Sequence, residues 1–431
     1  MKRAAAWCLA LLLLFCTAQA QEFTGYQTKA SDKRTLTDGV TYTAYRLTPL
    51  DEPAGRSQRL FVIDVQSNAK VSLTTALEAD LVHDSFMRVS EYASQEKKRG
   101  LNVLAALNGD FFDMTSGGPL GFDMRDGRWL TAGEFQQGWS LGFTADGKAI
   151  IGQCDMRLTV SATRDGENIL DETAINALNA PRADVEDGKS SPANALNARR
   201  DNAIVLYTKD WDAKTFTQDG GTEVRVNIAP DIRTGMCVTG EVTEINDALT
   251  STKIGTLEVP QGMTLDENSV VLSGIGEGAQ ALNALQIGDF VTLACTTDAL
   301  FENCVTVAGG GRPDGGPLLV KDGTFYESTE ELADDATYFY GRNPRMVFGV
   351  RKDGSYFFLV IEGNRSGSYG MTIDQTRQAA LDLGADIALN LDGGPSATMV
   401  IRQGKKFKLK TNTTGSGKQR KVGNALLLVG E

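Results

Sequence analysis

Near the end of the chain, residues 356–392 read YFFLVIEGNRSGSYGMTIDQTRQAALDLGADIALNLD. Phe357–Ile361 is a continuous apolar run, which is typical of a buried strand, and Ile387–Leu391 is a second such run. Between them, Thr372 and Gln375 have the spacing of a capping box, and a glycine lies just past the end of the helix that they predict. The stretch therefore predicts a strand, a helix and a strand, in which the two strands are parallel and joined by a right-handed connection.

The ends of these strands carry acidic residues. The carboxyl ends of parallel strands meet at one edge of a sheet, where ligands tend to bind. Glu362 follows the first strand and Asp392 the second, so we expect the two carboxylates to lie near one another. A helix predicted over residues 85–99 leads into a buried strand at residues 103–107, and Asp110 follows that strand. If this strand belongs to the same sheet, three carboxylates share the edge.

The rest of the chain is dominated by strand-like runs and turn signals. Asp126-Gly127 and Asp353-Gly354 are two of several Asp-Gly pairs between such runs, and they predict antiparallel hairpins. Together the patterns predict an α+β fold class, with a mixed, strand-rich sheet, a few helices and at least one βαβ unit near the C-terminus.

The predicted domain organisation is uneven. Residues 1–20 read as a signal peptide, residues 21–72 as an N-terminal strand-rich segment, and residues 73–431 as the main domain. Within the main domain, residues 176–202 are rich in Asn, Ala, Asp and Ser and predict an exposed loop insertion. Residues 203–308 again read as strands and are expected to form a subdomain.

The first residues indicate export. Lys2 and Arg3 precede an apolar run over residues 4–15, and Ala18-Gln19-Ala20 forms a small-x-small cleavage site, so we expect cleavage after Ala20. The apolar run is short for a permanent membrane span, and no later segment is long and apolar enough to be one. The sequence therefore predicts a secreted, extracytoplasmic protein without stable membrane insertion.

Cysteine and histidine usage narrows the chemistry. Outside the signal peptide the chain has Cys154, Cys237, Cys295 and Cys304, and an even number in an exported protein favours disulfides, although the pairing stays open. No C-x-x-C pair is present, which argues against a zinc site. The single histidine, His83, rules out a histidine-rich metal site and is expected at the surface.

The charge distribution is asymmetric. Without Lys2 and Arg3 the chain has 41 basic and 55 acidic side chains, a net charge of −14, whereas residues 341–431 carry a net charge of +7. An acidic protein with a basic last fifth is a poor nucleic-acid binder and fits a local site for a small anion better. A solvated surface is an equally good interpretation for the lysines at 405, 406, 408 and 410.

Four segments in order resemble the phosphodiester glycosidase family. They are Asn108-Gly-Asp110-Phe-Phe, the run from Asn343-Pro-Arg345 to Gly349, Glu362-Gly-Asn-Arg365-Ser, and Asn390-Leu-Asp392-Gly-Gly-Pro-Ser396-Ala-Thr398. The resemblance extends from about residue 73 to 429. Two positions depart from the family pattern: Pro395 replaces a third glycine, and Glu362 stands where an aspartate is common.

The resemblance implies an exported hydrolase that cleaves the glycosyl C–O bond of a sugar 1-phosphodiester in glycans, cell-wall polymers or exopolysaccharides. It implies catalytic roles as base, nucleophile or sugar-hydroxyl acceptor for Asp392, Asp110 and Glu362, with the assignment among them open. The implied substrate-binding residues are Arg345 and Arg365 for the phosphate, Asn108 and Asn390 for hydroxyl or acetamido groups, and Ser396 and Thr398 near the phosphate. No cofactor is required by this chemistry, and a Ca²⁺ site on the carboxylates is an open alternative.

Other interpretations remain at this stage. Asp392-Gly-Gly is also a plain turn sequence, Asp110 also suits a capping position, and Arg345 also suits a structural ion pair with Glu362. At the level of function, the alternatives are a non-catalytic carbohydrate-binding or polysaccharide-assembly protein and a phosphodiesterase that cleaves the P–O bond. The oligomeric state is not predicted.

Overall fold

The structure is a computed structural model of the whole chain. It describes residues 21–51, 56–83, 85–114, 116–133, 138–180, 201–217, 220–249, 251–254, 257–309, 318–327, 341–365 and 367–431. The predicted signal peptide and most of the predicted loop insertion, residues 181–200, lie outside this part of the chain. Strands predominate and helices are few, as the sequence predicts.

An eight-stranded sheet, here called sheet A, contains both strands of the segment 356–392. All its neighbouring strands are antiparallel. In spatial order it consists of β1 (Tyr26–Thr37), β2 (Val40–Pro49), β3 (Gln58–Val65), β25 (Tyr356–Ile361), β24 (Arg345–Val350), β26 (Ile387–Leu391), β22 (Leu318–Lys321) and β23 (Thr324–Phe325).

Helix α4 (Ile373–Asp382) connects β25 to β26. Its predicted capping box is confirmed, because the Thr372 hydroxyl accepts from the Gln375 N–H and the Gln375 side chain accepts from the Thr372 N–H. The two strands are both antiparallel to β24, which lies between them. They therefore run in the same direction without pairing, and the expected βαβ unit is split by an intervening strand.

A five-stranded sheet, sheet B, packs face to face against sheet A. Its order is β28 (Lys406–Leu409), β27 (Met399–Gln403), β6 (Val103–Asn108), β30 (Ala425–Gly430) and β4 (Val71–Ala76). One apolar core joins the two sheets, with Phe61 and Phe348 from sheet A and Leu107 and Leu426 from sheet B. Asp110 therefore follows a strand of sheet B, and not of the sheet that carries Glu362 and Asp392.

Helices cover the outer faces of both sheets. Helix α4 packs on sheet A, and α1 (Val89–Lys98) packs on sheet B through Val89, Tyr92 and Ala93. Helix α1 begins four residues later than the predicted residue 85, because β5 (Met87–Arg88) pairs with β29 (Lys421–Val422) in a short antiparallel ladder. The order of layers is α4, sheet A, sheet B and α1.

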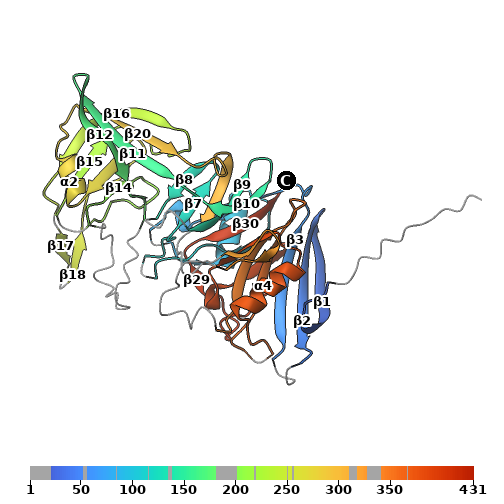
Figure 1. Ribbon diagram of the computed structural model, residues 1–431. Coiled ribbons are helices and arrows are strands. Elements are labelled where there is room, and N and C mark those ends of the chain that lie inside the picture. The colour runs from blue at the N-terminus through green and yellow to red at the C-terminus, as the bar shows by residue number, and fades with distance from the viewer. Residues whose placement is uncertain are drawn as a thin grey trace, which may run out of the picture.

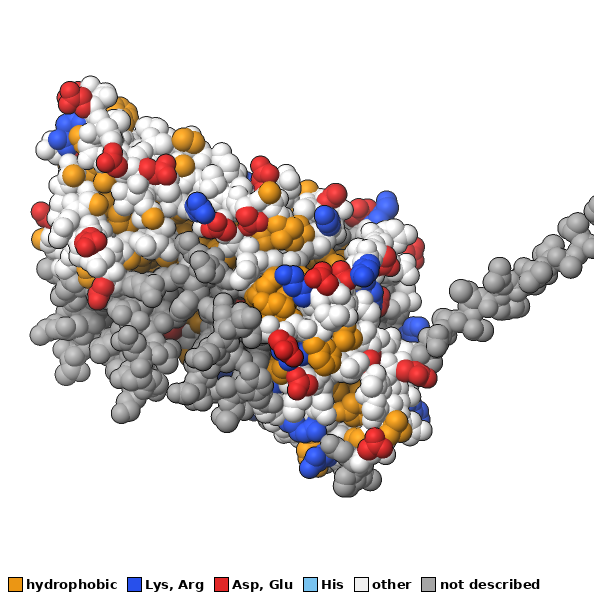
Figure 2. All heavy atoms as spheres, viewed as in Figure 1, with side chains coloured by type: hydrophobic (Ala, Val, Ile, Leu, Met, Phe, Trp, Pro, Cys, Tyr) orange, Lys and Arg blue, Asp and Glu red, His pale blue; other side chains and the backbone are white. Residues whose placement is uncertain are grey.

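Two further sheets extend the molecule away from β1 and β2 (Figure 1). The first lies beside sheets A and B and shares their apolar core, and the second forms the far end. The first consists of β10 (Ala149–Gln153), β9 (Trp139–Thr144), β21 (Cys304–Gly309), β7 (Phe122–Arg125) and β8 (Arg128–Thr131). The second consists of β12 (Glu167–Ile175), β11 (Arg157–Arg164), β20 (Phe290–Thr296), β16 (Cys237–Asn246), β15 (Thr222–Val226), β19 (Val270–Gly274), β14 (Ile204–Tyr207) and β13 (Ala177–Leu178). The remaining elements are η1 (Glu78–Asp80), β17 (Ser251–Ile254), β18 (Leu257–Pro260), α2 (Glu277–Leu282) and η2 (Gly394–Ser396). Acidic and basic side chains are interspersed over the face shown in Figure 2.

The disulfide prediction is not supported. All four cysteines of the described residues are free thiols, and only Cys237 is exposed. Cys237 pairs with Ala294, the residue before Cys295, so the two cysteines point to opposite faces of their sheet. Cys304 begins a strand of a different sheet.

The position of His83 differs from the prediction. The prediction that His83 is a surface residue is wrong: it is buried, its Nδ1 lies 2.7 Å from the Asp212 carboxylate, and its ring lies 4.9 Å from that of Trp211. No helix within the described ranges is long and apolar enough to cross a membrane.

Candidate active site

Three strand ends of sheet A meet at one edge. β24 begins at Arg345, which pairs with Ile361, and the next residue, Met346, pairs with Leu391. Glu362 and Asp392 therefore leave the sheet on the two sides of the start of β24. Their separation across an intervening strand is about 10 Å, because neighbouring strands lie about 4.8 Å apart.

Asn108 joins sheet B to this edge of sheet A. Its Nδ2 donates to the backbone carbonyl of Asp392 at 2.8 Å, and its Oδ1 accepts from the Thr398 N–H at 2.9 Å. Both ends of the predicted substrate-binding amide are thus used to hold the turn that carries Asp392. β6 also brings Asp110 to this place, two residues beyond its last residue.

The carboxyl group of Asp110 is buried and accepts two backbone hydrogen bonds, from Phe111 N–H at 2.8 Å and Gly121 N–H at 3.0 Å. Burial raises the pKa of Asp110 to about 8, against these two hydrogen bonds, which favour the ionised form. The nearby charge of Asp392 raises it further, so the two groups form a carboxyl pair.

The second member of the pair, Asp392, has a pKa of about 7, raised by burial. The Ser396 hydroxyl, the charge of Arg420 and the Gly393 N–H all favour its ionised form and oppose the rise. Asp392 therefore ionises before Asp110, and its charge then holds the proton on Asp110.

Two glycines let the turn after β26 approach the start of β24. A Cβ atom on Gly393 would lie 2.8 Å from the Pro344 carbonyl oxygen, and Gly394 has a φ of +55°. Pro395 follows in η2, where its missing N–H costs no helical hydrogen bond. The Gly-Gly-Pro sequence thus brings Asp392 and Ser396 together.

Asn424 holds the backbone of Asp110 in place through a hydrogen bond. The sequence analysis did not predict it as a site residue. Its Oδ1 accepts from the Asp110 N–H at 2.9 Å, and its Nδ2 donates to the buried Asp123 carboxylate at 2.8 Å. Thr75 donates to the other oxygen of Asp123. A Cβ atom on Gly109 would lie 2.2 Å from Asn424 Oδ1, which explains the glycine before Asp110.

Glu362 belongs to a separate cluster. Its carboxyl group is fully buried, accepts from the Asn412 N–H at 2.7 Å, and lies 3.6 Å from Arg59 and 3.5 Å from Arg365. Burial raises its pKa even though Arg59, Arg365 and the Asn412 N–H lower it. The third predicted carboxylate is therefore held beside two arginines and apart from the carboxyl pair.

The two predicted phosphate-binding arginines differ in their surroundings. Arg345 is buried, and its guanidinium donates to the backbone carbonyls of Met371 at 3.3 Å and Gly341 at 2.7 Å. These bonds use Nε and one N–H of Nη2 and fix the guanidinium against the backbone around the start of β24. Arg365 is partly exposed, with its Nη1 near Glu362.

Asn390 and Thr398 line the same region from β26 and from the start of β27. Both are buried, and the side-chain amide of Asn390 donates to the Leu391 carbonyl at 3.1 Å. Thr398 uses its backbone N–H to bind Asn108.

Arg420 is the cation that acts on Asp392, and sequence reasoning missed it. Its Nη1 donates to the Ser396 hydroxyl at 3.2 Å, its Nη2 contacts Met114 Sδ, and its guanidinium lies 5.5 Å from the Phe112 ring centre. The available signal was weak, because Arg420 is one of several basic residues in the last fifth of the chain.

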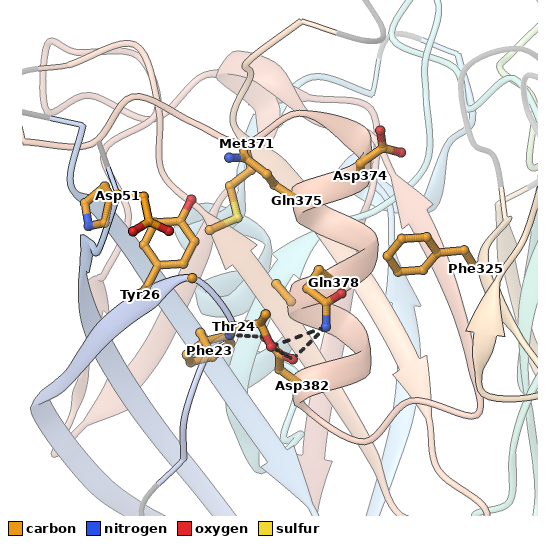
Figure 3. A pocket seen from close by; sticks show the side chains of 13 residues that line it. Phe23, Thr24, Tyr26, Asp51, Phe325, Met371, Asp374, Gln375, Gln378 and Asp382 are labelled. Carbon is orange, nitrogen blue, oxygen red and sulfur yellow. Dashed lines mark hydrogen bonds between the residues drawn. The ribbon is translucent and has the colours of Figure 1, made fainter. Parts of the chain in front are cut away.

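A hollow of about 410 Å³ lies on the other side of sheet A, between α4 and the N-terminal residues 23–26 (Figure 3). Its lining includes Asp51, Asp374 and Asp382 and no basic side chain. Asp382 is tied to the Thr24 N–H and hydroxyl and to Gln378. Such a lining disfavours a phosphate group, so we place the candidate site at the carboxyl pair.

The carboxylates do not form a metal-binding cluster. Among the residues with a described placement, no three His, Cys, Asp or Glu side chains come together in a way that could hold a metal ion.

Comparisons with known proteins show what this chain is similar to in sequence and fold. Residues 238–429 match the family model described as phosphodiester glycosidase, which confirms the resemblance predicted from the sequence. This part of the chain is similar to that family, and it contains Glu362, Asp392 and Arg420, whereas Asp110 lies before it. No curated protein is detectably similar in sequence.

Two crystal structures share the fold over most of the chain. A hypothetical protein from Synechocystis is 17% identical with a TM-score of 0.67, and the match covers 94% of this chain and 68% of that one. A predicted exported protein from Burkholderia pseudomallei is 19% identical with a TM-score of 0.65, covering 94% and 97%. The catalytic domain of zebrafish N-acetylglucosamine-1-phosphodiester alpha-N-acetylglucosaminidase matches at 14% identity over 94% and 88%, but its TM-score of 0.42 is too low to support an argument.

Proposed function

We propose that the chain hydrolyses a sugar 1-phosphodiester at the bond between the anomeric carbon and its oxygen, releasing the sugar and a phosphate monoester. The observation that carries the proposal is the pair of carboxyl groups held at one edge by Asn108 and Asn424, buried Asp110 and half-buried Asp392. Desolvation raises their pKa values to about 8 and about 7. Between these values one carboxyl group is protonated while the other is ionised, which is the state that an acid and a base require. The family match supports the same reaction class.

In the proposed reaction, Asp392 accepts a proton from a water molecule whose oxygen bonds to the anomeric carbon. The C–O bond to the phosphate breaks, its electron pair stays on the phosphate oxygen, and Asp110 gives its proton to that oxygen. Asp392 then holds the proton that Asp110 has lost, and exchange with solvent restores the starting state.

Positive charge near the leaving phosphate lowers the barrier, because charge develops there as the bond breaks. We propose Arg420 as the main phosphate ligand, since it lies beside Ser396 and acts on Asp392. Arg365 is a second candidate for the phosphate, and Arg345 is a third. Asn390, Ser396 and Thr398 are proposed to orient the substrate, while Asn108 positions Asp392.

We infer that the reaction takes place outside the cytoplasm, on a glycan, cell-wall polymer or exopolysaccharide that carries sugar phosphate. The composition of residues 1–20 supports export. The structural similarity to a predicted exported protein of Burkholderia pseudomallei agrees with it.

The test is a turnover assay with protein that begins at Gln21. A nitrophenyl or nucleotide sugar 1-phosphodiester is the substrate, and release of the free sugar is followed. We expect Asp392→Asn to lower kcat by about 10²- to 10⁴-fold, which is the usual contribution of a general base. Asp38→Asn, at an exposed turn, is the matched control and keeps full activity. Binding without sugar release by the unmodified protein would instead identify a non-catalytic carbohydrate-binding protein.

A further inference from the structure

A basic groove lies beside the candidate active site and takes no part in the reaction described above. It has a volume of about 950 Å³ and runs between α1 and the hairpin of β27 and β28. Its lining contains five basic side chains, Lys97, Lys98, Arg99, Lys405 and Lys406, and one acidic side chain, Glu91.

The positive charge of the lining is only partly balanced by acidic side chains. Glu91 pairs with Arg88, which lies outside the lining, at 2.8 Å. Arg99 is engaged by Asp80 and Glu96. The exposed side chains of Lys98, Lys405 and Lys406 leave a local excess of positive charge.

The groove and the active site are connected through one end of α1. Ser90, in the first turn of the helix, accepts from the Gln419 side-chain amide through its hydroxyl at 2.8 Å and donates its N–H to the Gln419 Oε1 at 3.1 Å. Arg420 is the next residue. At the other end of the helix, Lys97 donates to the Lys405 carbonyl at 2.8 Å. Ten helical residues span about 15 Å, so the first turn of α1, which Gln419 contacts, lies about that far from the hairpin tip.

The part of the chain that supplies Lys405 and Lys406 to the groove is rich in positive charge. Residues 393–430 contain eight Lys and Arg and no Asp or Glu, in a protein with a net charge of −12. Lysines in the last turn of α1 also suit the helix dipole, but that explanation does not apply to Lys405 and Lys406 at a hairpin tip. A cluster of exposed cations about one helix length from a proposed phosphate ligand attracts a ligand with several anionic groups.

We propose that the groove binds a polymeric glycan with repeating phosphodiester groups, so that phosphates next to the cleaved one contact Lys98, Lys405 and Lys406. Ser94 and Gln95 also line the groove, between the basic side chains and the first turn of α1. This inference rests on the proposed function and adds that the natural substrate is a polyanionic polymer and not an isolated sugar phosphodiester.

The first test compares substrates of two sizes with two double variants. Lys405→Ala with Lys406→Ala removes the hairpin-tip charges and leaves the Lys405 carbonyl available to Lys97. Lys148→Ala with Lys352→Ala removes two exposed lysines from turns elsewhere. We expect the groove variant to raise KM for a phosphodiester-linked glycan polymer about tenfold at low salt, with kcat unchanged. KM for a nitrophenyl sugar phosphodiester stays the same in both variants. Equal effects of the two variants on the polymer would overturn the inference.

A binding measurement separates this inference from the proposed function. Fluorescently labelled poly(glycerol phosphate) is titrated with unmodified protein and both double variants. The unmodified protein could turn over no sugar phosphodiester while only the groove variant binds the polymer more weakly. That outcome would support the groove as a polymer-binding site and contradict the proposed enzymatic function. Single-stranded DNA with the same number of phosphates is the competitor. Equal affinity for the DNA would mean an unspecific cation patch and would contradict the inference.

Discussion

At the scale of single residues, the carboxyl pair makes a prediction about pH. The base Asp392 must be ionised and the acid Asp110 protonated, so kcat/KM falls below the pKa of about 7 and above the pKa of about 8. We expect a bell-shaped profile with its maximum between these values, measured by sugar release in buffers of constant ionic strength. A flat profile over this range would show that the pair does not control the reaction.

Arg420 makes a second prediction at this scale. Its charge favours ionised Asp392, so Arg420→Gln raises the pKa of Asp392 and moves the acidic limb of the profile to higher pH. Loss of the phosphate ligand also lowers kcat/KM, by about tenfold or more. Lys418→Gln, an exposed neighbour, is the control and leaves both quantities unchanged. A reduced rate without movement of the acidic limb would assign Arg420 a role remote from Asp392.

At the scale of elements, the loop that carries Asn424 into β30 supports Asp110. Asn424→Ala leaves the Asp110 N–H and the Asp123 carboxylate without these hydrogen bonds in a buried place. We expect the free energy of unfolding to fall by about 1–3 kcal/mol, as for other unsatisfied buried groups. Denaturant unfolding measures this change. Thr372→Ala, which removes the cap of α4, is the comparison: it costs about 1 kcal/mol and leaves the pH profile of activity as it is.

The elements of the last fifth of the chain could be predicted from the sequence because their signals are local. The apolar run at 357–361, the one at 387–391 and the capping box at Thr372 each lie within a few residues. The pairing could not be predicted in the same way, since β24 inserts between β25 and β26 through contacts that no local pattern records. For the same reason the strand before Asp110 lies in sheet B and not in sheet A.

The candidate site, like the fold, could be predicted from the sequence only where its residues belong to local motifs. Asp110 and Asp392 carry recognisable motifs, and the structure places them together. Asn108 and Arg345 are buried at the same place, but their hydrogen bonds go to the backbone, which residue type alone does not reveal. Arg420 and Asn424 reach the carboxyl pair only because β29 and β30 return the end of the chain to sheet B.

At the scale of the whole molecule, the carboxyl pair of buried Asp110 and half-buried Asp392 makes stability depend on pH. Both groups ionise at an ordinary value of 3.8 when exposed but hold their protons to about 7 and 8 in the folded chain. Between these limits the folded state binds more protons than the unfolded state, so stability falls as pH rises from about 4 to about 8. In Asp392→Asn, which cannot ionise there, we expect the loss between pH 5 and pH 8 to be smaller by at least about 1 kcal/mol. Thermal unfolding at both pH values measures it, and an unchanged loss would contradict burial of an ionisable Asp392.

The central claim is hydrolysis at the glycosyl C–O bond by this carboxyl pair. The most direct measurement is turnover of a sugar 1-phosphodiester in water labelled with heavy oxygen, followed by mass spectrometry of both products. The account predicts that the label enters the sugar and that the phosphate monoester carries none. Label in the phosphate would mean cleavage of the P–O bond and would contradict the account.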